Sequence, residues 1–169
     1  MSSPRRPIIL NQMGNVHEHY HDLLRLTYQH YVRSLPLSAR LPMCSMLIQC
    51  FCPAPSVIAV WNHGQLHEHI SWFFHARESN PVAYSVQRTR FHDLPDVCRH
   101  RYPTVLPLAD ATGDEMYTEC LVLPLWYQQH YSGWIEVYAT RWNRWSDDPQ
   151  VVQFLGDLSG ELATILVDP

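Results

Sequence analysis

Residues 120–167 decide the fold of this chain, and they read CLVLPLWYQQHYSGWIEVYATRWNRWSDDPQVVQFLGDLSGELATILV. Two runs rich in apolar, β-branched and aromatic residues, 119–126 and 133–140, stand on either side of the polar stretch 128–130. Such runs with a short polar connection are typical of two strands joined in a hairpin. The first part of the stretch therefore predicts an antiparallel pair of strands.

The second part of the stretch predicts a long amphipathic helix, because its apolar residues recur at intervals of four and three. We expect Ser146 to cap this helix, with Asp147 and Asp148 in its first turn, where negative charge complements the helix dipole. Gly156 and Gly160 lie four residues apart and predict close packing against another helix. The apolar stripe consists of Val151, Leu155, Leu158, Leu162 and Ile165.

Two more helices are expected in the N-terminal part, behind a flexible lead over residues 1–14. The first begins at Asn15, carries apolar residues at helical spacing and is broken at Pro36. The second covers 43–52, directly behind Pro42, because proline is favoured in the first turn of a helix. A strand remains an alternative for this short apolar segment.

A second hairpin is expected in the middle of the chain. The apolar segments 56–61 and 66–74 are separated by Asn-His-Gly at 62–64, which is a turn signal. Residues 76–118 have no sustained periodicity, apart from a short helix expected near 82–88. The whole order is helix, helix, hairpin, long connection, hairpin, helix. It predicts one α+β domain over 15–169, with an antiparallel sheet and its terminal helices on one face.

Three features of the C-terminal third occur in a fixed order. An apolar-Pro-apolar step, Leu123-Pro124-Leu125, is followed by a turn and a Gly-apolar strand, 133–137. An aromatic loop then leads into an amphipathic helix from 145 onward. This combination resembles the GAF domain family over about residues 15–166, in order and pattern rather than in an invariant signature. Residues 91–97 lie where that family often has a short strand ending in an aspartate.

The resemblance implies a GAF-like sheet with N- and C-terminal helices on one face and a pocket on the other, covered by loops and a helix. It further implies a regulatory sensor module for a small molecule. Such domains often pair through their terminal helices in a parallel bundle, so a homodimer is expected.

Composition excludes several classes of function. The chain carries 12 Lys+Arg and 16 Asp+Glu, a formal charge of -4, and all of its cations are arginine. Direct nucleic-acid binding needs a basic stripe, and none is visible. The apolar run 120–126 is far shorter than the roughly 20 residues that cross a bilayer. The five cysteines include no CxxC pair, which favours reduced thiols and a cytoplasmic protein.

One segment matches a metalloprotease motif. His17-Glu18-His19-Tyr20-His21 fits H-E-x-x-H, in which His17 and His21 would bind zinc and Glu18 would act as general base. The chain holds 11 histidines, so chance matches are common, and no third ligand follows at the metzincin spacing. A solvated helix face is the favoured reading, and a metal-dependent hydrolase is the alternative.

Two histidines share a face of the expected strand 66–74. His67 and His69 alternate with Leu66 and Ile70, so the two pairs point to opposite sides. Two histidines at i and i+2 are able to bind one metal, but the glutamate and glycine of a cupin-like site are missing. We expect the pair to be exposed or to line a pocket, and no metal site is assigned.

Cys120 lies on an expected strand near the pocket that the resemblance implies. The related free methionine sulfoxide reductases carry a reactive cysteine in a glycine-rich loop with a second cysteine, and this sequence has neither. Cys98 lies beside Arg99 and Arg101, which would lower a thiol pKa if the groups converged. No resolving partner is visible, so redox catalysis is not expected.

The ligand is expected among the tryptophans of the strands, beneath a central connection in which five of the twelve arginines lie between 77 and 101. Arginine forks suit carboxylate or phosphate groups, although solvated ion pairs are the more common use of such residues. The candidate ligand-binding residues are Trp61, His69, Trp72, Arg90, His92, Tyr102, Cys120, Trp134 and Glu136.

The sequence therefore predicts a ligand-responsive regulator of a transcriptional or signalling output, without catalytic turnover. Its partners would be a small molecule, a second copy and an output domain or regulator, with no direct nucleic-acid or membrane contact. The cofactor is unknown. The alternatives are the zinc hydrolase and a protein-interaction scaffold whose pocket is closed by tryptophans.

Overall fold

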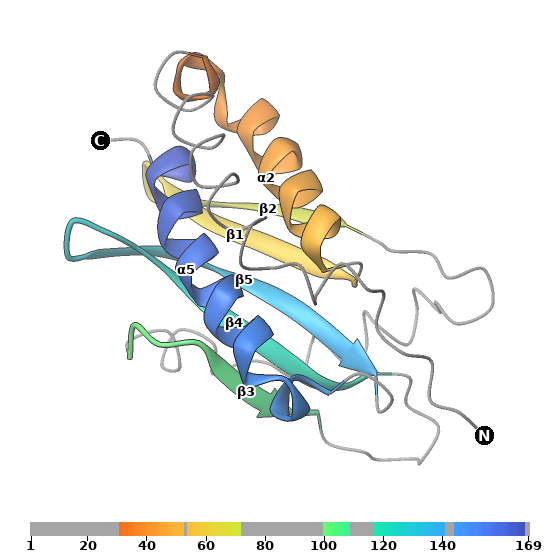
Figure 1. Ribbon diagram of the computed structural model, residues 1–169. Coiled ribbons are helices and arrows are strands. Elements are labelled where there is room, and N and C mark those ends of the chain that lie inside the picture. The colour runs from red at the N-terminus through yellow and green to blue at the C-terminus, as the bar shows by residue number, and fades with distance from the viewer. Residues whose placement is uncertain (1–30, 53, 72–99, 109–116, 141–143, 168–169) are drawn as a thin grey trace.

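The centre of the molecule is an antiparallel sheet of five strands in the order β2-β1-β5-β4-β3 (Figure 1). The computed structural model describes residues 31–52, 54–71, 100–108, 117–140 and 144–167. Both expected hairpins are present, as β1–β2 and β4–β5, and β1 pairs with β5 between them. The strands are β1 (Ser56–Asn62), β2 (Gln65–Ser71), β3 (Thr104–Pro107), β4 (Tyr117–Tyr127) and β5 (His130–Thr140).

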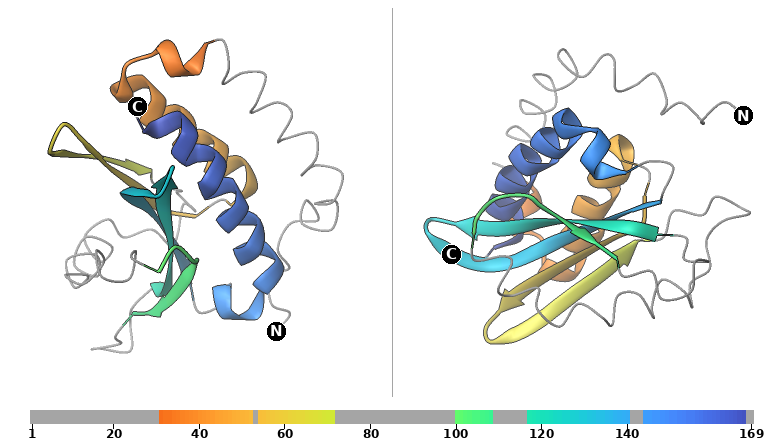
Figure 2. Two further views of the ribbon diagram at one scale, coloured as in Figure 1. Left: turned by 90° about the vertical axis from the view of Figure 1, so that its left-hand side faces the viewer. Right: turned by 90° about the horizontal axis from the view of Figure 1, so that it is seen from below.

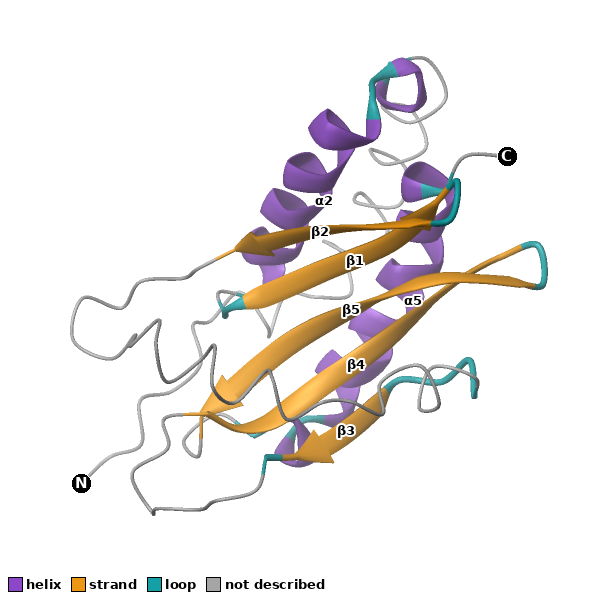
Figure 3. Cartoon of the chain, turned by 180° about the vertical axis from the view of Figure 1, so that it is seen from behind, coloured by secondary structure: helices purple, strands orange, loops and turns teal. Residues whose placement is uncertain are grey.

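Two helices cover one face of this sheet, which confirms the expected α+β architecture (Figures 1 and 3). They are α2 (Leu37–Phe51) and α5 (Pro149–Leu166), and each follows a short 3-10 turn, η2 (Val32–Ser34) or η3 (Trp145–Asp147). Seen along the sheet, both helices lie on the same side of the strands (Figure 2). We call this side the helix face and the opposite side the distal face.

The main hydrophobic core lies between the helix face and the two helices. It takes alternate residues of the strands and the inward stripes of α2 and α5, as the period-two and helical patterns require. Fully buried members from the strands include Ile58, Leu121, Leu123, Ile135 and Val137, and Ile48, Leu155 and Leu162 meet them from the helices.

The two helices are held to each other at both ends. Phe51 packs on Phe154 with ring centroids 5.2 Å apart. Near the other end, the buried Arg40 donates a hydrogen bond from Nη1 to the carbonyl oxygen of Ile165, at 2.8 Å. Because the last carbonyls of a helix have no partner within it and carry partial negative charge, this guanidinium stabilises the end of α5.

Helix α2 begins earlier than the sequence indicated, so the expected start behind Pro42 is wrong. The helix starts at Leu37, with Pro36 at its N-cap, and Pro42 lies inside it. Amides of Ala39 and Arg40 already donate to the Pro36 carbonyl, which closes the first turn. Pro42 removes one interior donor, and the loss is tolerated because the buried stripe of α2 holds the helix on the sheet.

The start of α5 also differs from the expectation. Asp148, rather than Ser146, is the N-cap, and its side chain accepts from the amide of Val151 at 3.2 Å. Pro149 follows at the first helical position, where a missing amide costs nothing. Ser146 lies in η3 and points its hydroxyl at β4 instead.

Strand β3 differs from the expectation, which was an irregular segment over 76–118 apart from one short helix. It has only four residues and pairs with β4 at the edge of the sheet. Pro103 precedes it and Pro107 ends it. Because proline is rare within strands, these residues argued against a strand in the sequence. At an edge strand, proline also prevents pairing with a further strand.

The two glycines of α5 play different parts. A Cβ at Gly156 would lie 2.6 Å from Cγ of Pro103, so this glycine permits close contact with the approach to β3 rather than with another helix. A Cβ at Gly160 would meet nothing within 4 Å. The expected helix–helix groove is therefore wrong for the described residues.

Several expectations fall outside the described residues. These are the lead at 1–14, the helix from Asn15 with the His17–His21 motif, the short helix at 82–88 and the strand-like segment 91–97. Of the helices in the described ranges, neither is both long and apolar enough to cross a membrane.

Candidate functional site

The distal face carries a second, smaller cluster of buried side chains. Strands β1, β4 and β5 supply them by alternation, interrupted only by the register shift between Tyr117 and Glu119 on β4. The cluster consists of Val57, Ala59, Tyr117, Cys120, Val122, Trp134 and Tyr138, with Leu106, Leu108 and Tyr131 packed at its margin. This face differs from the helix face in being rich in aromatic side chains.

A fully buried carboxylate lies in the middle of that cluster. Glu136 on β5 has no exposed surface, and its cross-strand neighbours are Val57 on β1 and Val122 on β4. Trp134 donates from Nε1 to Oε1 of Glu136 at 2.8 Å, and the hydroxyl of Tyr138 donates to Oε2 at 2.5 Å. Three alternate residues of one strand thus form a donor–acceptor–donor row.

The row explains how the sheet tolerates a carboxylate between two valines. Burying a polar group costs free energy unless hydrogen bonds replace those it made to water. Trp134 and Tyr138 each supply one, and as neighbours along β5 they also fix the direction of the Glu136 side chain.

Three residues predicted for the site come together on the distal face. Cys120 is fully buried opposite Tyr138, and Trp134 and Glu136 belong to the row. Trp61 lies on the same side of β1 but near the β1–β2 turn, where it is 46% exposed beside Leu66.

Other predicted site residues are placed elsewhere. His69 lies opposite Ile58 in the register and therefore on the helix face, where it is half-buried. Its neighbour Ile70 is on the distal face and exposed. Tyr102 lies ahead of β3 and is 74% exposed. Trp72, Arg90 and His92 are outside the described residues.

Sequence reasoning missed Tyr138, the second donor to Glu136. The signal was available, since W-I-E-V-Y alternates and puts residues 134, 136 and 138 on one side of the strand. Tyr117 was also missed, and its ring packs edge-on against that of Tyr138, with centroids 6.1 Å apart.

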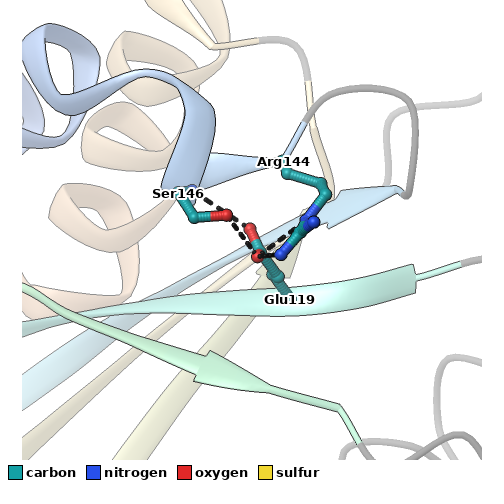
Figure 4. Close-up of polar contacts among 3 residues, drawn as sticks. All are labelled: Glu119, Arg144 and Ser146. Carbon is teal, nitrogen blue, oxygen red and sulfur yellow. Dashed lines mark hydrogen bonds and ion pairs between the residues drawn. The ribbon is translucent and has the colours of Figure 1, made fainter.

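A second buried carboxylate, Glu119 on β4, has a different setting (Figure 4). It accepts from the Ser146 hydroxyl at 2.7 Å and amide at 3.2 Å, and it pairs with Arg144 at 3.0 Å. Burial alone would raise the pKa of Glu119, but the Ser146 hydrogen bonds and the Arg144 charge outweigh it, so the pKa lies below its usual range. These contacts join β4 to the start of α5 and make Glu119 a structural residue.

The thiols offer no activated nucleophile in the described part of the chain. Cys44, Cys52 and Cys120 are buried and Cys50 is exposed, and none of these four forms a disulfide. Burial raises the pKa of Cys44 to about 12, although nearby Arg40 acts in the opposite direction. No group of three or more His, Cys, Asp or Glu in the described ranges is arranged to hold a metal ion.

The arrangement as a whole matches known structures. A GAF domain from an Acinetobacter phosphoenolpyruvate-protein phosphotransferase is similar at a TM-score of 0.53 and 17% identity, over 88% of this chain and 92% of that one. The GAF domain of A. aeolicus nlh2, solved in an inactive state, is similar at 0.53 and 13% identity, over 93% and 96%. The fold is GAF-like.

The expected resemblance is thereby confirmed at the level of fold. No protein-family model matches the sequence, and no curated protein matches it either. At these identities the likeness establishes a GAF-like architecture and leaves the chemistry of the site to the residues of this chain.

Proposed function

We propose that this chain is a ligand-responsive sensor domain without catalytic turnover, and that its small-molecule ligand binds over the distal face. The observation that carries the proposal is the fully buried Glu136, held between Trp134 and Tyr138 on the face that the helices do not cover. The GAF-like fold supports a regulatory role, since one neighbour is the GAF domain of a phosphoenolpyruvate-protein phosphotransferase and the other is a GAF domain described in an inactive state.

The chemistry of the face defines the kind of ligand. Aromatic rings and small aliphatic side chains favour a planar or apolar body, and one fixed carboxylate favours a hydrogen-bond donor or a positive charge. The ligand is therefore a small planar molecule that presents an N–H or ammonium group to Glu136.

The response is transmitted through β5 to the helices. Ile135 and Val137 alternate with Glu136 along the strand and belong to the core beneath α5. A ligand that moves Glu136 therefore also changes the packing under α5. The output is transcriptional or signalling control through a homodimer of the terminal helices and a partner or output domain, in the cytoplasm.

The test is a thermal-shift screen with a panel of planar amines and heterocycles. A true ligand raises the melting temperature in a saturable way, because binding to the folded state alone stabilises it. Glu136→Gln should weaken binding about tenfold, since a charge-assisted hydrogen bond is lost. Trp134→Phe keeps an aromatic ring but removes the N–H that orients Glu136. It should weaken ligand binding less than Glu136→Gln does.

Asp157→Asn is the matched control, because it removes one carboxylate from the exposed side of α5. It should bind as the wild type does. A panel without any hit, or equal binding by Glu136→Gln and wild type, would contradict the proposed site. Light scattering tests the dimer separately, and a monomer at all concentrations would exclude it.

A further inference from the structure

Figure 3 shows the end of the sheet where β4 turns into β5, and the residues at this end include several aromatic and basic ones. We call this surface the hairpin-end patch, and it consists of Arg101, Tyr102, Trp126, Tyr127 and Tyr131. The residues come from two distant segments, the approach to β3 and the β4–β5 hairpin. The two segments are in contact at Arg101 and Trp126, where the guanidinium carbon lies 4.1 Å from the ring centroid.

The backbone at the patch is held in unfavourable conformations. Arg101, Gln128 and Gln129 have φ values of 55°, 48° and 74°, although none of them is glycine. Such turns normally use Asn or Gly, because a Cβ is disfavoured in the left-handed region. Strain of this kind persists where surrounding contacts impose it, and it is concentrated at functional surfaces.

Arg101 is oriented and still available for binding. Its guanidinium carbon lies over the Trp126 ring, and within the described residues the side chain makes no hydrogen bond or ion pair. A guanidinium that contacts a ring by its face keeps its N–H groups, which lie in its plane, for other partners. Because the side chain is already fixed, less conformational entropy is lost when a carboxylate binds to that fork.

The aromatic residues add an apolar platform. Tyr102 is 74% exposed, and Trp126 and Tyr131 pack with ring centroids 5.8 Å apart. Tyr131 also borders the distal-face cluster, so the patch is continuous with the candidate ligand site. Trp, Tyr and Arg are the residues most enriched at the energetic centres of protein interfaces.

The charge of the patch is opposite to that of the chain. The chain as a whole carries a formal charge of -4. Residues 100–108 and 124–133 contain no Asp or Glu, and their ionisable groups include Arg101, His100 and His130. An exposed surface of this kind repels basic partners and attracts acidic ones.

We propose that the hairpin-end patch docks an acidic segment of a partner protein that also carries apolar side chains. Carboxylates of that segment bind the fork of Arg101, and its apolar side chains pack on Tyr102 and on the Trp126–Tyr131 pair. This surface goes beyond the proposed ligand site, because it would serve as the contact through which the domain meets its partner.

The test uses a fluorescein-labelled short peptide of alternating Glu and Leu, with fluorescence polarisation as the readout. Wild-type protein should bind it, with an affinity that falls as salt is raised, because the contact is exposed and ionic. A peptide with Lys in place of Glu should not bind. Arg101→Gln should raise the dissociation constant about tenfold, as the loss of a charge-assisted pair predicts.

Two further variants separate the parts of the surface. Tyr102→Ala removes an exposed ring without touching the core and should weaken binding severalfold. Arg33→Gln removes the same charge as Arg101→Gln from an exposed position on η2, and it should leave binding unchanged. Glu136→Gln should also bind the peptide normally. The peptide-binding proposal and the ligand-site proposal are therefore tested independently of each other.

Three results would overturn the proposal. One is binding that Arg101→Gln and Arg33→Gln reduce equally, or that neither reduces. The second is full displacement of the peptide by inorganic phosphate at equal concentration, which would indicate a small-anion site. The third is self-association of the protein that Arg101→Gln abolishes, which would assign the patch to a second copy of this chain.

Discussion

At the scale of single residues, the two buried carboxylates show that the partners of a carboxylate decide its role in the protein. Glu119 contacts a serine and an arginine beside α5, so its bonds join two elements. Glu136 is bonded by donors of its own strand, so Trp134 and Tyr138 fix its orientation within β5. The first arrangement joins two elements of the fold, and the second holds a buried carboxylate among the aromatic rings of the distal face.

The lowered pKa of Glu119 makes a prediction about acid stability. A carboxylate whose pKa is lower in the folded state stabilises the protein above its ordinary value of 4.5, and this contribution is lost as pH falls through the folded-state pKa. Glu119→Gln should therefore lower the free energy of unfolding by about 1 kcal/mol near neutral pH, a modest value because Arg144 is half exposed.

Urea unfolding at a series of pH values measures this effect. The difference between wild type and Glu119→Gln should shrink below pH 4.5. A difference that stays constant throughout the acid range would show that Glu119 is protonated in the folded protein or acts only through its shape. Asp157→Asn, on the exposed side of α5, serves again as the control.

The cysteines should differ sharply in reactivity. Thiolate is the reactive form, so buried Cys44, with a pKa of about 12, should be inert near neutral pH. Exposed Cys50 should react with a maleimide well before Cys44, Cys52 or Cys120. Peptide mapping by mass spectrometry after brief labelling identifies the modified site. Labelling of Cys44 as fast as Cys50, in protein that remains folded, would contradict the burial of α2 against the sheet.

At the scale of elements, the sequence predicted those with a clear period and mislocated those that depend on single contacts. Apolar, β-branched runs separated by short polar turns identified both hairpins. The start of α5 was misplaced because Ser146 and Asp148 are both good caps, and only contact with Glu119 commits the serine elsewhere.

The short strand β3 also depends on a contact between elements, which local sequence does not show. Its four residues follow Pro103 and end in Pro107, and they have too few positions to show a period. What makes them a strand is pairing with β4, which lies beyond the reach of local pattern.

Helix α5 offers a matched pair of substitutions. Gly160→Ala should raise the free energy of unfolding by about 0.5–1 kcal/mol, because alanine favours the helix and the new methyl meets open space. Gly156→Ala gains the same propensity but presses on the Pro103 ring, and it should lower stability by about 1 kcal/mol. Urea midpoints measured side by side give both values. Equal stabilisation by the two would show that α5 does not contact the approach to β3 in solution.

At the scale of the whole molecule, the order of elements was enough to predict the α+β class and the GAF-like arrangement. The candidate site was predicted as a set of residues without an assignment to faces. The structure puts Cys120, Trp134 and Glu136 together on the distal face and His69 on the helix face, and their role in ligand binding stays a prediction. Strand alternation separates the two sides of a strand but does not reveal which side faces the helices.

The central claim is that a ligand binds over the distal face at Glu136, and the indole N–H signals of tryptophan test it most directly. Trp134 donates to Glu136 on the distal face, and Trp145 donates to the Val137 carbonyl on the helix face at 2.9 Å. Trp134→Phe and Trp145→Phe assign the two signals in a ¹H–¹⁵N spectrum. A hit from the thermal-shift screen should move the Trp134 signal strongly and the Trp145 signal much less. A ligand that stabilises the protein yet leaves the Trp134 signal unmoved would contradict the account.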